Sequence, residues 1–211
     1  MLSDKAGLSS WFFRAIFLIP LMLVLWWGLL VDGYLVGLRH LADFVLPHLF
    51  SKGVHSIQPF QNGGWLISTG LNVIGKNPPE EFLFQLDKVR YLNRTVMGVP
   101  LLWALILASK RNFTGAIVWG SLLQTIICLL GISAYIWGVL AEVLSPGDAL
   151  FIRVNGAPDL MVAGKPYSSF WVFLASVAFF GQTLTIPVIA PLLVWGIFCA
   201  NEIKGLVGIR W

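Results

Sequence analysis

Four long apolar runs, separated by polar segments, dominate the pattern of this chain. They cover about residues 11–31, 91–109, 113–140 and 169–200. Each run is long enough to cross roughly 30 Å of hydrocarbon as a helix that rises about 1.5 Å per residue. The pattern therefore predicts an all-α membrane bundle with four transmembrane helices, organised as a single integral membrane domain over residues 1–211.

The first run is expected to stay in the protein as an uncleaved anchor. It is longer than the apolar region of a usual signal peptide, and the sequence VDGYL from Val31 onward has no small-x-small cleavage site. Arg14 lies only a few residues inside this run. Its guanidinium can extend back to the cytoplasmic surface, and the alternative is a buried ion pair.

The fourth run is too long for one straight crossing. Its 32 residues exceed the hydrocarbon thickness. Pro187 and Pro191 predict a break, because each removes a backbone donor and clashes with the preceding turn. Gln182, Thr183 and Thr185 come just before them and can satisfy the carbonyls that a kink frees, or alternatively line a substrate path.

Basic residues beside the short connections set the expected orientation. Spans two, three and four are flanked by Lys110, Arg111, Lys204 and Arg210. Since cytoplasmic connections are enriched in Lys and Arg, both termini are predicted to be cytoplasmic. Residues 32–90 and 141–168 then form two extracytoplasmic loops. Arg90 and Arg94 border the second span, where they anchor it or bind a lipid phosphate.

The first loop begins with an amphipathic segment, residues 33–45. Its apolar residues at helical spacing are Tyr34, Leu38, Leu41 and Val45. The segment is bounded by Pro47, which is expected to end the helix. The pattern predicts a helix that lies at the membrane surface.

Strand patterns follow in both loops. Residues 65–73 and 81–89 alternate apolar and polar positions, with Phe82, Phe84 and Leu86 on one face of the second stretch. In the other loop, the apolar stretches 151–154 and 159–162 flank an Asn-Gly pair, a hairpin signal. An isolated hairpin is marginal in water. The stretches are therefore expected to combine into one small extracytoplasmic β element built from the two loops.

The composition supports a membrane protein and limits its partners. Hydrophobic residues make up 57% of the chain and charged residues 11%, against about a quarter charged in soluble domains, and the mean hydropathy is +0.81. The net charge of +4 is scattered, without the dense basic cluster that grips phosphate backbones. The bilayer and a larger membrane protein complex are the expected partners, and nucleic acid is not.

Candidate chemistry is limited to one cluster of ligand-type residues, His40, Asp43 and His48. Positions 40 and 43 share a helix face, and a transition-metal site needs about three converging ligands. The alternative is that these polar side chains simply solvate a surface helix. Glycine-rich phosphate loops, a Ser-His-Asp set and paired carboxylates within a span are absent from the sequence, and no cofactor is expected.

Two functions from different classes remain open at this point. The first is a non-catalytic accessory or scaffolding subunit that acts through helix packing and the outer sheet. The second is a metal-dependent membrane enzyme subunit that uses His40, Asp43 and His48. Cys128 and Cys199 lie inside apolar runs, which favours buried small hydrophobes over a disulfide or a metal pair.

Several stretches carry a family resemblance. They are FFRAIFLIPLMLVLWW (12–27), the strand-like segment before the second span, YLNRTVMGVPLLWALILAS (91–109) and TIPVIAPLLVW (185–195). In this order they resemble the small exosortase-associated membrane proteins of Gram-negative bacteria, particularly those that accompany exosortase H.

The resemblance implies an accessory role in a protein-sorting system of the cell envelope. It does not imply the transpeptidase itself. The accessory hypothesis by itself also leaves open a secretion or pilus-type system of the bacterial inner membrane. Exosortases place a Cys, an Arg and a His at the outer membrane face, whereas here Cys128 lies within the third span and Cys199 near the cytoplasmic end of the fourth. All His residues belong to the first loop, so the enzyme's triad is not expected.

Overall fold

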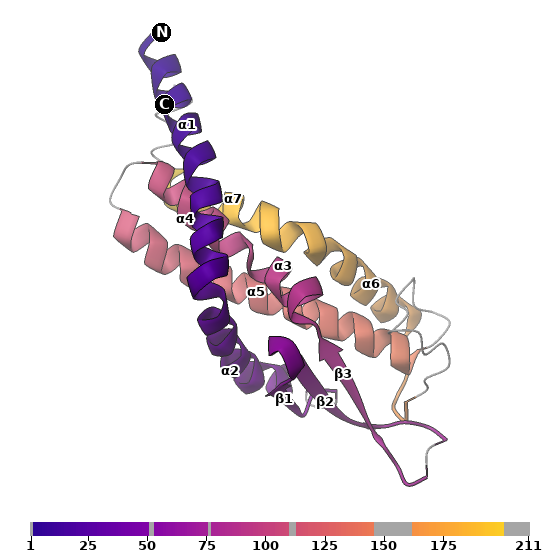
Figure 1. Cartoon of the computed structure of the whole chain (residues 1–211). Coiled ribbons are helices and arrows are strands. Elements are labelled where there is room, and N and C mark those ends of the chain that lie inside the picture. Colours follow the sequence, from indigo (N-terminus) through magenta and orange to yellow (C-terminus); the bar gives the residue numbers. More distant parts are fainter. Residues whose placement is uncertain (1, 51–52, 76, 110–112, 146–161, 201–211) are drawn as a thin grey trace. The chain divides into compact units, whose positions relative to one another are not determined.

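A computed structural model describes residues 2–50, 53–75, 77–109, 113–145 and 162–200 of the chain (Figure 1). The helices and helical turns are α1 (Leu2–Leu25), η1 (Trp26–Leu30), α2 (Val31–Leu49), η2 (Gln61–Gly63), η3 (Lys88–Leu92), α3 (Asn93–Val96), α4 (Gly98–Ala108), α5 (Phe113–Leu144), α6 (Ser169–Leu184), η4 (Thr185–Ile189) and α7 (Ala190–Phe198). The strands are β1 (Ser56–Pro59), β2 (Trp65–Asn72) and β3 (Glu81–Leu86).

The predicted membrane fold is confirmed. In the described part of the chain, the helical stretches Ser9–Leu49, Lys88–Ala108, Phe113–Leu144 and Ser169–Phe198 are long and apolar enough to cross a membrane. The second therefore begins before the expected Tyr91, and the third continues beyond the expected residue 140. Alongside them lies one small antiparallel sheet.

The chain divides into two compact units, each assembled from separate stretches. Unit 1 contains Met1–Val31, Arg94–Cys128 and Leu184–Trp211. Unit 2 contains Asp32–Asn93 and Leu129–Thr183. Helix α5 supplies its first half to unit 1 and its second half to unit 2.

Unit 1 is a helical bundle in which α4 contacts both α1 and α7. Its buried core contains Leu102, Ile106, Val194 and Cys199. A Cβ built on Gly120 of α5 would lie 3.4 Å from a Leu102 methyl group and 3.6 Å from a Val194 methyl group. The small residue thus lets the three helices approach closely, as expected for small residues in membrane helices.

Two indole N–H groups inside unit 1 donate to serine hydroxyls. Trp103 donates to Ser121 Oγ at 2.7 Å, and Trp195 donates to Ser109 Oγ at 2.8 Å. Hydrocarbon offers no acceptor for these groups, so each Ser lowers the cost of burying a Trp. The Trp195 ring also stacks on Trp11 of α1, with centroids 5.3 Å apart.

The predicted break in the fourth span is a π-helical turn. In η4 the hydrogen bonds shift to five residues, so that the Ala190 N–H donates to the Thr185 carbonyl. In that register the next donor is Pro191, which has no N–H, and the Ile186 carbonyl loses its partner. Gln124 of α5 replaces it: Nε2 donates to Ile186 O at 3.3 Å.

Two of the side chains expected to satisfy this kink act elsewhere. The Gln182 amide oxygen lies 3.3 Å from the Tyr91 hydroxyl, and Thr183 Oγ1 bonds the Phe179 carbonyl at 3.5 Å, within α6. The prediction is wrong for these two because the free Ile186 carbonyl turns toward α5, a direction that the local sequence does not encode. Gln124, which has no exposed surface, is the residue that sequence reasoning missed.

Close approach at this kink requires a glycine at position 98. A Cβ on Gly98 would lie 2.5 Å from Gln124 Nε2 and 2.9 Å from Ile186 O. Contacts under 3.0 Å force a neighbour to move, and one of these atoms belongs to the backbone. Gly98 thus gives Gln124 the space to reach the free carbonyl.

Unit 2 contains the sheet, whose strand order is β1-β2-β3. Trp65 pairs with Leu86 and Ile67 with Phe84, and these side chains are all buried on one face. The predicted alternation in both strands is confirmed, although the strands end at Asn72 and Leu86.

Two features of the sheet differ from expectation. Strand β1 was not predicted, because SIQP contains a single aliphatic residue and ends in Pro59. Most of the hairpin predicted from 151–154 and 159–162 lies outside the described residues. Val162, however, forms an antiparallel bridge with Val73, which joins the second loop to the sheet.

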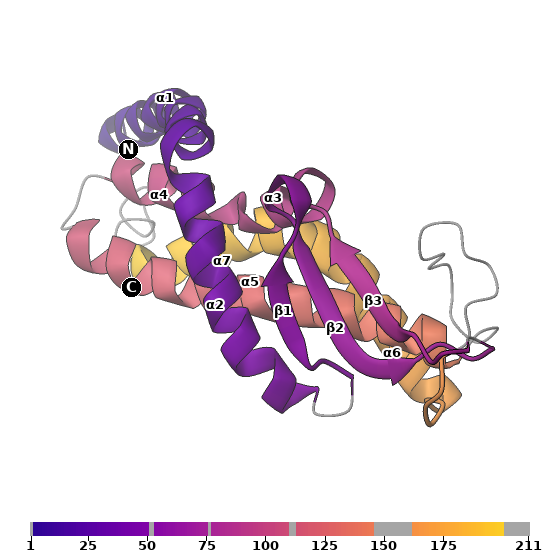
Figure 2. The same ribbon diagram turned by 60° about the horizontal axis from the view of Figure 1, so that its bottom comes forward.

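Helix α2 lies beside β1 in both ribbon views (Figures 1 and 2). It follows α1 through the π turn η1 without a loop, and it continues through Pro47 to Leu49, so the expected end at Pro47 was wrong. Its buried residues are Val31, Leu35, Leu38, Ala42 and Leu46. Of the apolar positions expected at helical spacing, Leu38 is buried and Leu41 is 40% exposed, because the small Ala42 meets the interior of unit 2.

Tyrosine residues form several of the contacts between the membrane helices of unit 2. The Tyr91 hydroxyl donates to the Gly131 carbonyl at 3.0 Å, and its ring lies 4.1 Å from that of Tyr135. At the ends of α5 and α6, the Tyr167 N–H donates to Ser145 Oγ at 2.9 Å. The second loop therefore starts and finishes at adjacent positions.

We expect Gly98→Ala to lower the free energy of unfolding by about 1–3 kcal/mol, because the added methyl group overpacks the site and displaces Gln124. Thermal unfolding of the detergent-solubilised protein, followed by Trp fluorescence, measures this. Gly115→Ala on α5 is the control: no atom lies within 4 Å of its built Cβ. The control should be neutral or slightly stabilising, and equal losses in both variants would contradict the account.

Candidate docking groove

A groove of about 310 Å³ lies in unit 2, between α2 and the turn that leads into β2. One wall comes from α2, through Asp32, Leu35, Val36 and Arg39. These positions are spaced three or four residues apart and so share one helix face. The other wall comes from residues 62–65, Pro59 and Lys88.

The floor of the groove is apolar and its rim is charged. Leu35 and Trp65 are buried, whereas Val36 is 51% exposed. At the rim, Lys88 Nζ lies 2.5 Å from Asp32 Oδ1, and Arg39 Nη2 donates to His40 Nε2 at 3.3 Å. An exposed pair such as Lys88–Asp32 adds only about 0–1 kcal/mol of stability, so its main effect is to set the groove's geometry.

The turn opposite α2 is held in a left-handed conformation. Asn62 has φ 56° and Gly63 has φ 76°, a region that Asn and Gly tolerate best. The Phe60 N–H donates to the Gly64 carbonyl at 2.8 Å, which closes the turn. A Cβ on Gly63 would lie 2.9 Å from Lys88 Cδ, so this glycine also makes room for the lysine.

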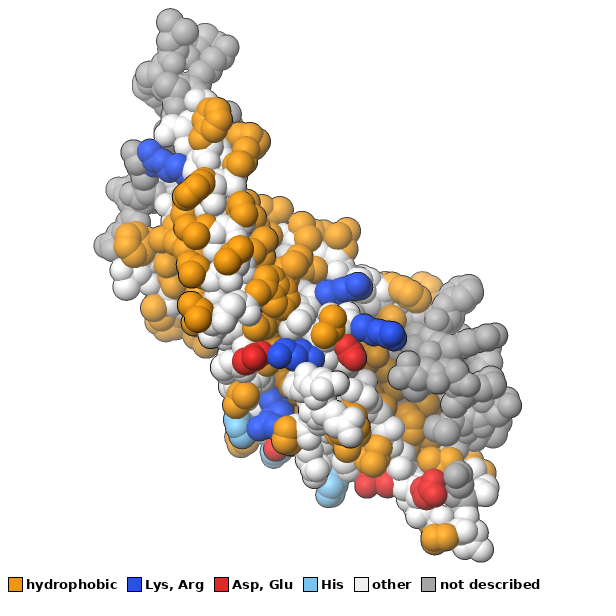
Figure 3. All heavy atoms as spheres, in the orientation of Figure 1, with side chains coloured by type: hydrophobic (Ala, Val, Ile, Leu, Met, Phe, Trp, Pro, Cys, Tyr) orange, Lys and Arg blue, Asp and Glu red, His pale blue; other side chains and the backbone are white. Residues whose placement is uncertain are grey.

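Lys88 is positioned by the start of the second span. The residue before it, Asp87, caps η3, since its carboxylate accepts from the Arg90 N–H at 2.7 Å. In the space-filling view, acidic, basic and His side chains gather over unit 2, whereas hydrophobic side chains cover α1 of unit 1 (Figure 3). The polar surface thus belongs to the segment predicted to lie outside the membrane.

The three predicted metal ligands lie on α2 but bind separate partners. His40 contacts Arg39, the Asp43 carboxylate accepts from the Ile57 N–H at 2.7 Å, and His48 Nδ1 bonds the Phe44 carbonyl at 2.8 Å. Among the described residues, no three His, Cys, Asp or Glu side chains form a group that could hold a metal ion. The metal site stays a prediction, which elemental analysis of the purified protein tests.

Asp43 has a structural role that the sequence did not reveal. By accepting the Ile57 N–H it caps the outer edge of β1. Unpaired edge groups invite pairing with other chains, and a charged side chain is one way to prevent it. This carboxylate therefore contributes to holding β1 beside α2.

Other residues of interest lie outside the groove. Arg90 is exposed at the start of the second span. Both cysteines are buried, as expected for small hydrophobes, and the Cys128 thiol donates to the Thr95 carbonyl at 3.3 Å. Arg14, in unit 1, makes no hydrogen bond or ion pair with any residue that the structure describes.

The carboxylate of Glu81, at the start of β3, accepts two hydrogen bonds from β2. The Ser68 hydroxyl and the Gly70 N–H, the latter at 2.7 Å, both donate to its Oε1. These two donors hold the pKa of Glu81 below its ordinary value, and the charge of His55 adds to the effect. The carboxylate thus stabilises the irregular part of the β2–β3 pairing between Ser68 and Asn72.

Sequence reasoning located α2 and two strands, but not the groove between α2 and the turn at residues 62–65. Asp32 and Lys88 are 56 residues apart, and no local pattern links them. The available signal was QNGG at 61–64, a turn sequence directly before a strand.

The family model for exosortase H-associated membrane proteins matches residues 5–202. The chain belongs to this family. The match covers every described helix and strand beyond the first few residues of α1, and it confirms the resemblance found in the sequence. Comparisons with curated proteins and with solved structures gave no match.

Family membership indicates the class of partner, which the geometry does not show. Exosortase H-associated proteins are, by the family's description, membrane proteins that accompany an exosortase, the enzyme of a protein-sorting system. A partner protein in the membrane is thereby implied. The groove in unit 2 has both a shape and a mixed polar and apolar lining.

We expect Glu81→Gln to destabilise the protein at pH 7 and to destabilise it less at pH 3. Since the folded-state pKa is lowered, the carboxylate stabilises the fold above its unfolded pKa, about 4.3, and this contribution is lost as the pH falls through the folded value. Thermal unfolding at both pH values measures the difference. Glu80→Gln removes the same charge one residue away and should show a smaller pH dependence; equal behaviour would contradict the assignment.

Proposed function

We propose that this protein is a non-catalytic accessory or scaffolding subunit of a bacterial cell-envelope complex, which holds its exosortase-type partner through the groove between α2 and residues 62–65. The observation that carries the proposal is the combination of family membership over residues 5–202 with this groove. The family supplies the class of partner, and the groove supplies a surface for it.

The groove has the composition expected of a docking site. Interfaces combine an apolar, well-packed centre with a polar rim, and here Leu35, Val36 and Trp65 lie between the charged Arg39 and Lys88. Both walls are preorganised, one by a helix and the other by a closed turn. Less conformational entropy is then lost when a partner binds.

The polar groups of the groove are better suited to orienting a partner than to catalysing a reaction. Lys88 is paired with Asp32, and Arg39 with His40. Groups that already bind one another orient a partner and set the charge of the rim. The rim carries two positive charges from Lys88 and Arg39 against one negative charge from Asp32, which favours a partner segment with an acidic group.

Co-purification with the cognate exosortase tests this surface. We expect Val36→Asp, and separately Arg39→Glu, to reduce recovery of the partner about tenfold or more, the effect of losing roughly 1.4 kcal/mol or more at a central contact. Phe44→Asp is the matched control, since Phe44 lies on the same helix, is exposed and does not line the groove.

The control should bind as well as the wild type. Wild-type recovery with both groove variants would reject the groove as the docking surface. Loss of binding with Phe44→Asp as well would assign the contact to α2 in general and not to the groove.

We further propose that the protein lies in the inner membrane with both termini in the cytoplasm. Lys110 and Arg111 in the short connection between spans two and three support this orientation. The groove and the sheet, which lie between the first and second spans, would then face the periplasm, where sorted proteins are exposed.

Fusions to alkaline phosphatase, an enzyme active only outside the cytoplasm, measure the orientation. We expect activity for fusions after residue 60 or residue 165, and none after residue 110 or at the C-terminus. Matched fusions to a fluorescent protein that folds only in the cytoplasm should give the reverse pattern. Active phosphatase after residue 110 would invert the proposed topology.

A further inference from the structure

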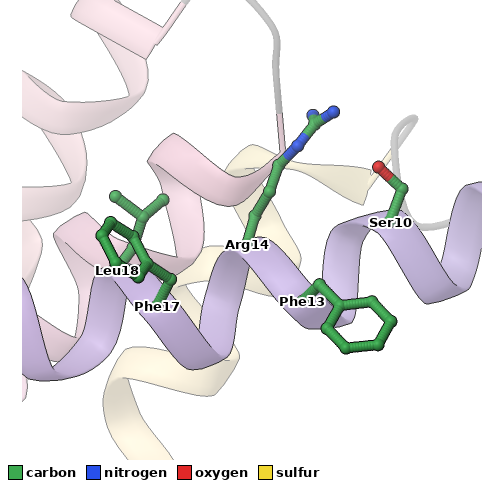
Figure 4. A pocket seen from close by; sticks show the side chains of 5 residues that line it. All are labelled: Ser10, Phe13, Arg14, Phe17 and Leu18. Carbon is green, nitrogen blue, oxygen red and sulfur yellow. The ribbon is translucent and has the colours of Figure 1, made fainter.

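A second hollow lies in unit 1, on the surface of α1 (Figure 4). Its volume is about 520 Å³, and it is lined by Ser10, Phe13, Arg14, Phe17 and Leu18. All these residues come from two and a half turns of one helix. The hollow is separate from the docking groove and belongs to a span of which little is covered by the rest of the chain: 17% of its most apolar window is buried, against 61% for the second and third spans.

Arg14 is the charged residue among those that line this hollow, and no described residue carries a charge that pairs with it. It lies three positions beyond Trp11, about 4.5 Å along the helix into the apolar run. It has no ion pair or hydrogen bond with any described residue. An unpaired charge at the edge of hydrocarbon is costly unless an anion or water reaches it, so the site favours an anionic ligand.

The polar and apolar groups are ordered along the helix. Figure 4 shows the Ser10 hydroxyl and the Arg14 guanidinium directed to the same side of α1, one turn apart. Phe17 and Leu18 lie on the side of Arg14 that is deeper in the apolar run, and Phe13 flanks it. A ligand that fits this order has an anionic head and an apolar tail parallel to the helix.

We propose that this hollow is a binding site for an anionic phospholipid, whose phosphate pairs with Arg14 and accepts from the Ser10 hydroxyl while an acyl chain lies along Phe17 and Leu18. Phosphate and guanidinium match in charge and in geometry, because the planar donor fork can bind two oxygens. The volume falls within the roughly 300–1,000 Å³ of small-molecule sites.

Lipid is favoured over a partner's carboxylate by the surroundings of Arg14. The rings of Phe13 and Phe17 are 72% and 70% exposed on the same span, as side chains that face acyl chains are. A basic residue at this depth lies near the headgroup level, where the phosphates of the bilayer are. This inference does not depend on the docking groove.

Native mass spectrometry of the purified protein, without any partner, tests the site. The protein is equilibrated with equal amounts of phosphatidylglycerol and phosphatidylcholine, and the ratio of the two bound lipids is measured. We expect the wild type to prefer phosphatidylglycerol and Arg14→Gln to reduce that preference about fivefold. Arg14→Lys should retain most of it, since the charge is kept.

Lys165→Gln is the control, because it removes one positive charge from an exposed position outside the spans. It should keep the wild-type ratio. If Arg14→Gln cannot be purified, Ser10→Ala tests the same contact and should lower the ratio in the same direction.

A wild type without preference, or an unchanged ratio in Arg14→Gln and Ser10→Ala, would overturn the proposal. So would displacement of phosphatidylglycerol by millimolar inorganic phosphate, which would show that the site takes a free anion. Loss of exosortase co-purification in Arg14→Gln with an unchanged lipid ratio would assign Arg14 to a protein contact instead.

Discussion

Hydrocarbon provides no hydrogen-bond partner, so every backbone group within a span must be satisfied by the protein itself. The fourth span shows what this requires. Pro191 leaves the Ile186 carbonyl without a donor, Gln124 of another helix supplies one, and Gly98 of a third helix leaves the space for it. The missing N–H of Pro191 thus accounts for the glycine on α4 and the glutamine on α5 that meet at η4 in unit 1.

Outside the spans, side chains of unit 2 also pair with backbone groups. The carboxylate of Asp43 satisfies the edge of β1, and that of Asp87 satisfies the start of η3. The turn at Asn62 and Gly63 reverses the chain in the left-handed region and leaves room for Lys88. These bonds hold the turn and the start of η3 that form one wall of the groove, and they place Lys88 at its rim.

The groove in unit 2 and the hollow on α1 are suited to different kinds of ligand. The groove in unit 2 offers shaped walls and paired charges, which suit recognition of a protein segment. The hollow on α1 offers a guanidinium that pairs with none of the described residues, beside exposed aromatic rings, which suits a lipid headgroup and its chain. In the proposed accessory role, the groove would hold a partner and the hollow would bind a lipid of the bilayer.

The sequence by itself determined the four spans, the amphipathic character of residues 33–45, the strands from Trp65 and Glu81, and the position of the proline break. These features are imposed by local periodicity and by the length needed to cross a bilayer, both of which are written in consecutive residues. Only the tertiary structure decided which face of α2 is buried, that β1 exists, that Gln124 satisfies the kink, and that Asp32 meets Lys88. Each of these depends on residues far apart in the chain, whose meeting is set by packing and by the need to pair buried polar groups, not by any local pattern.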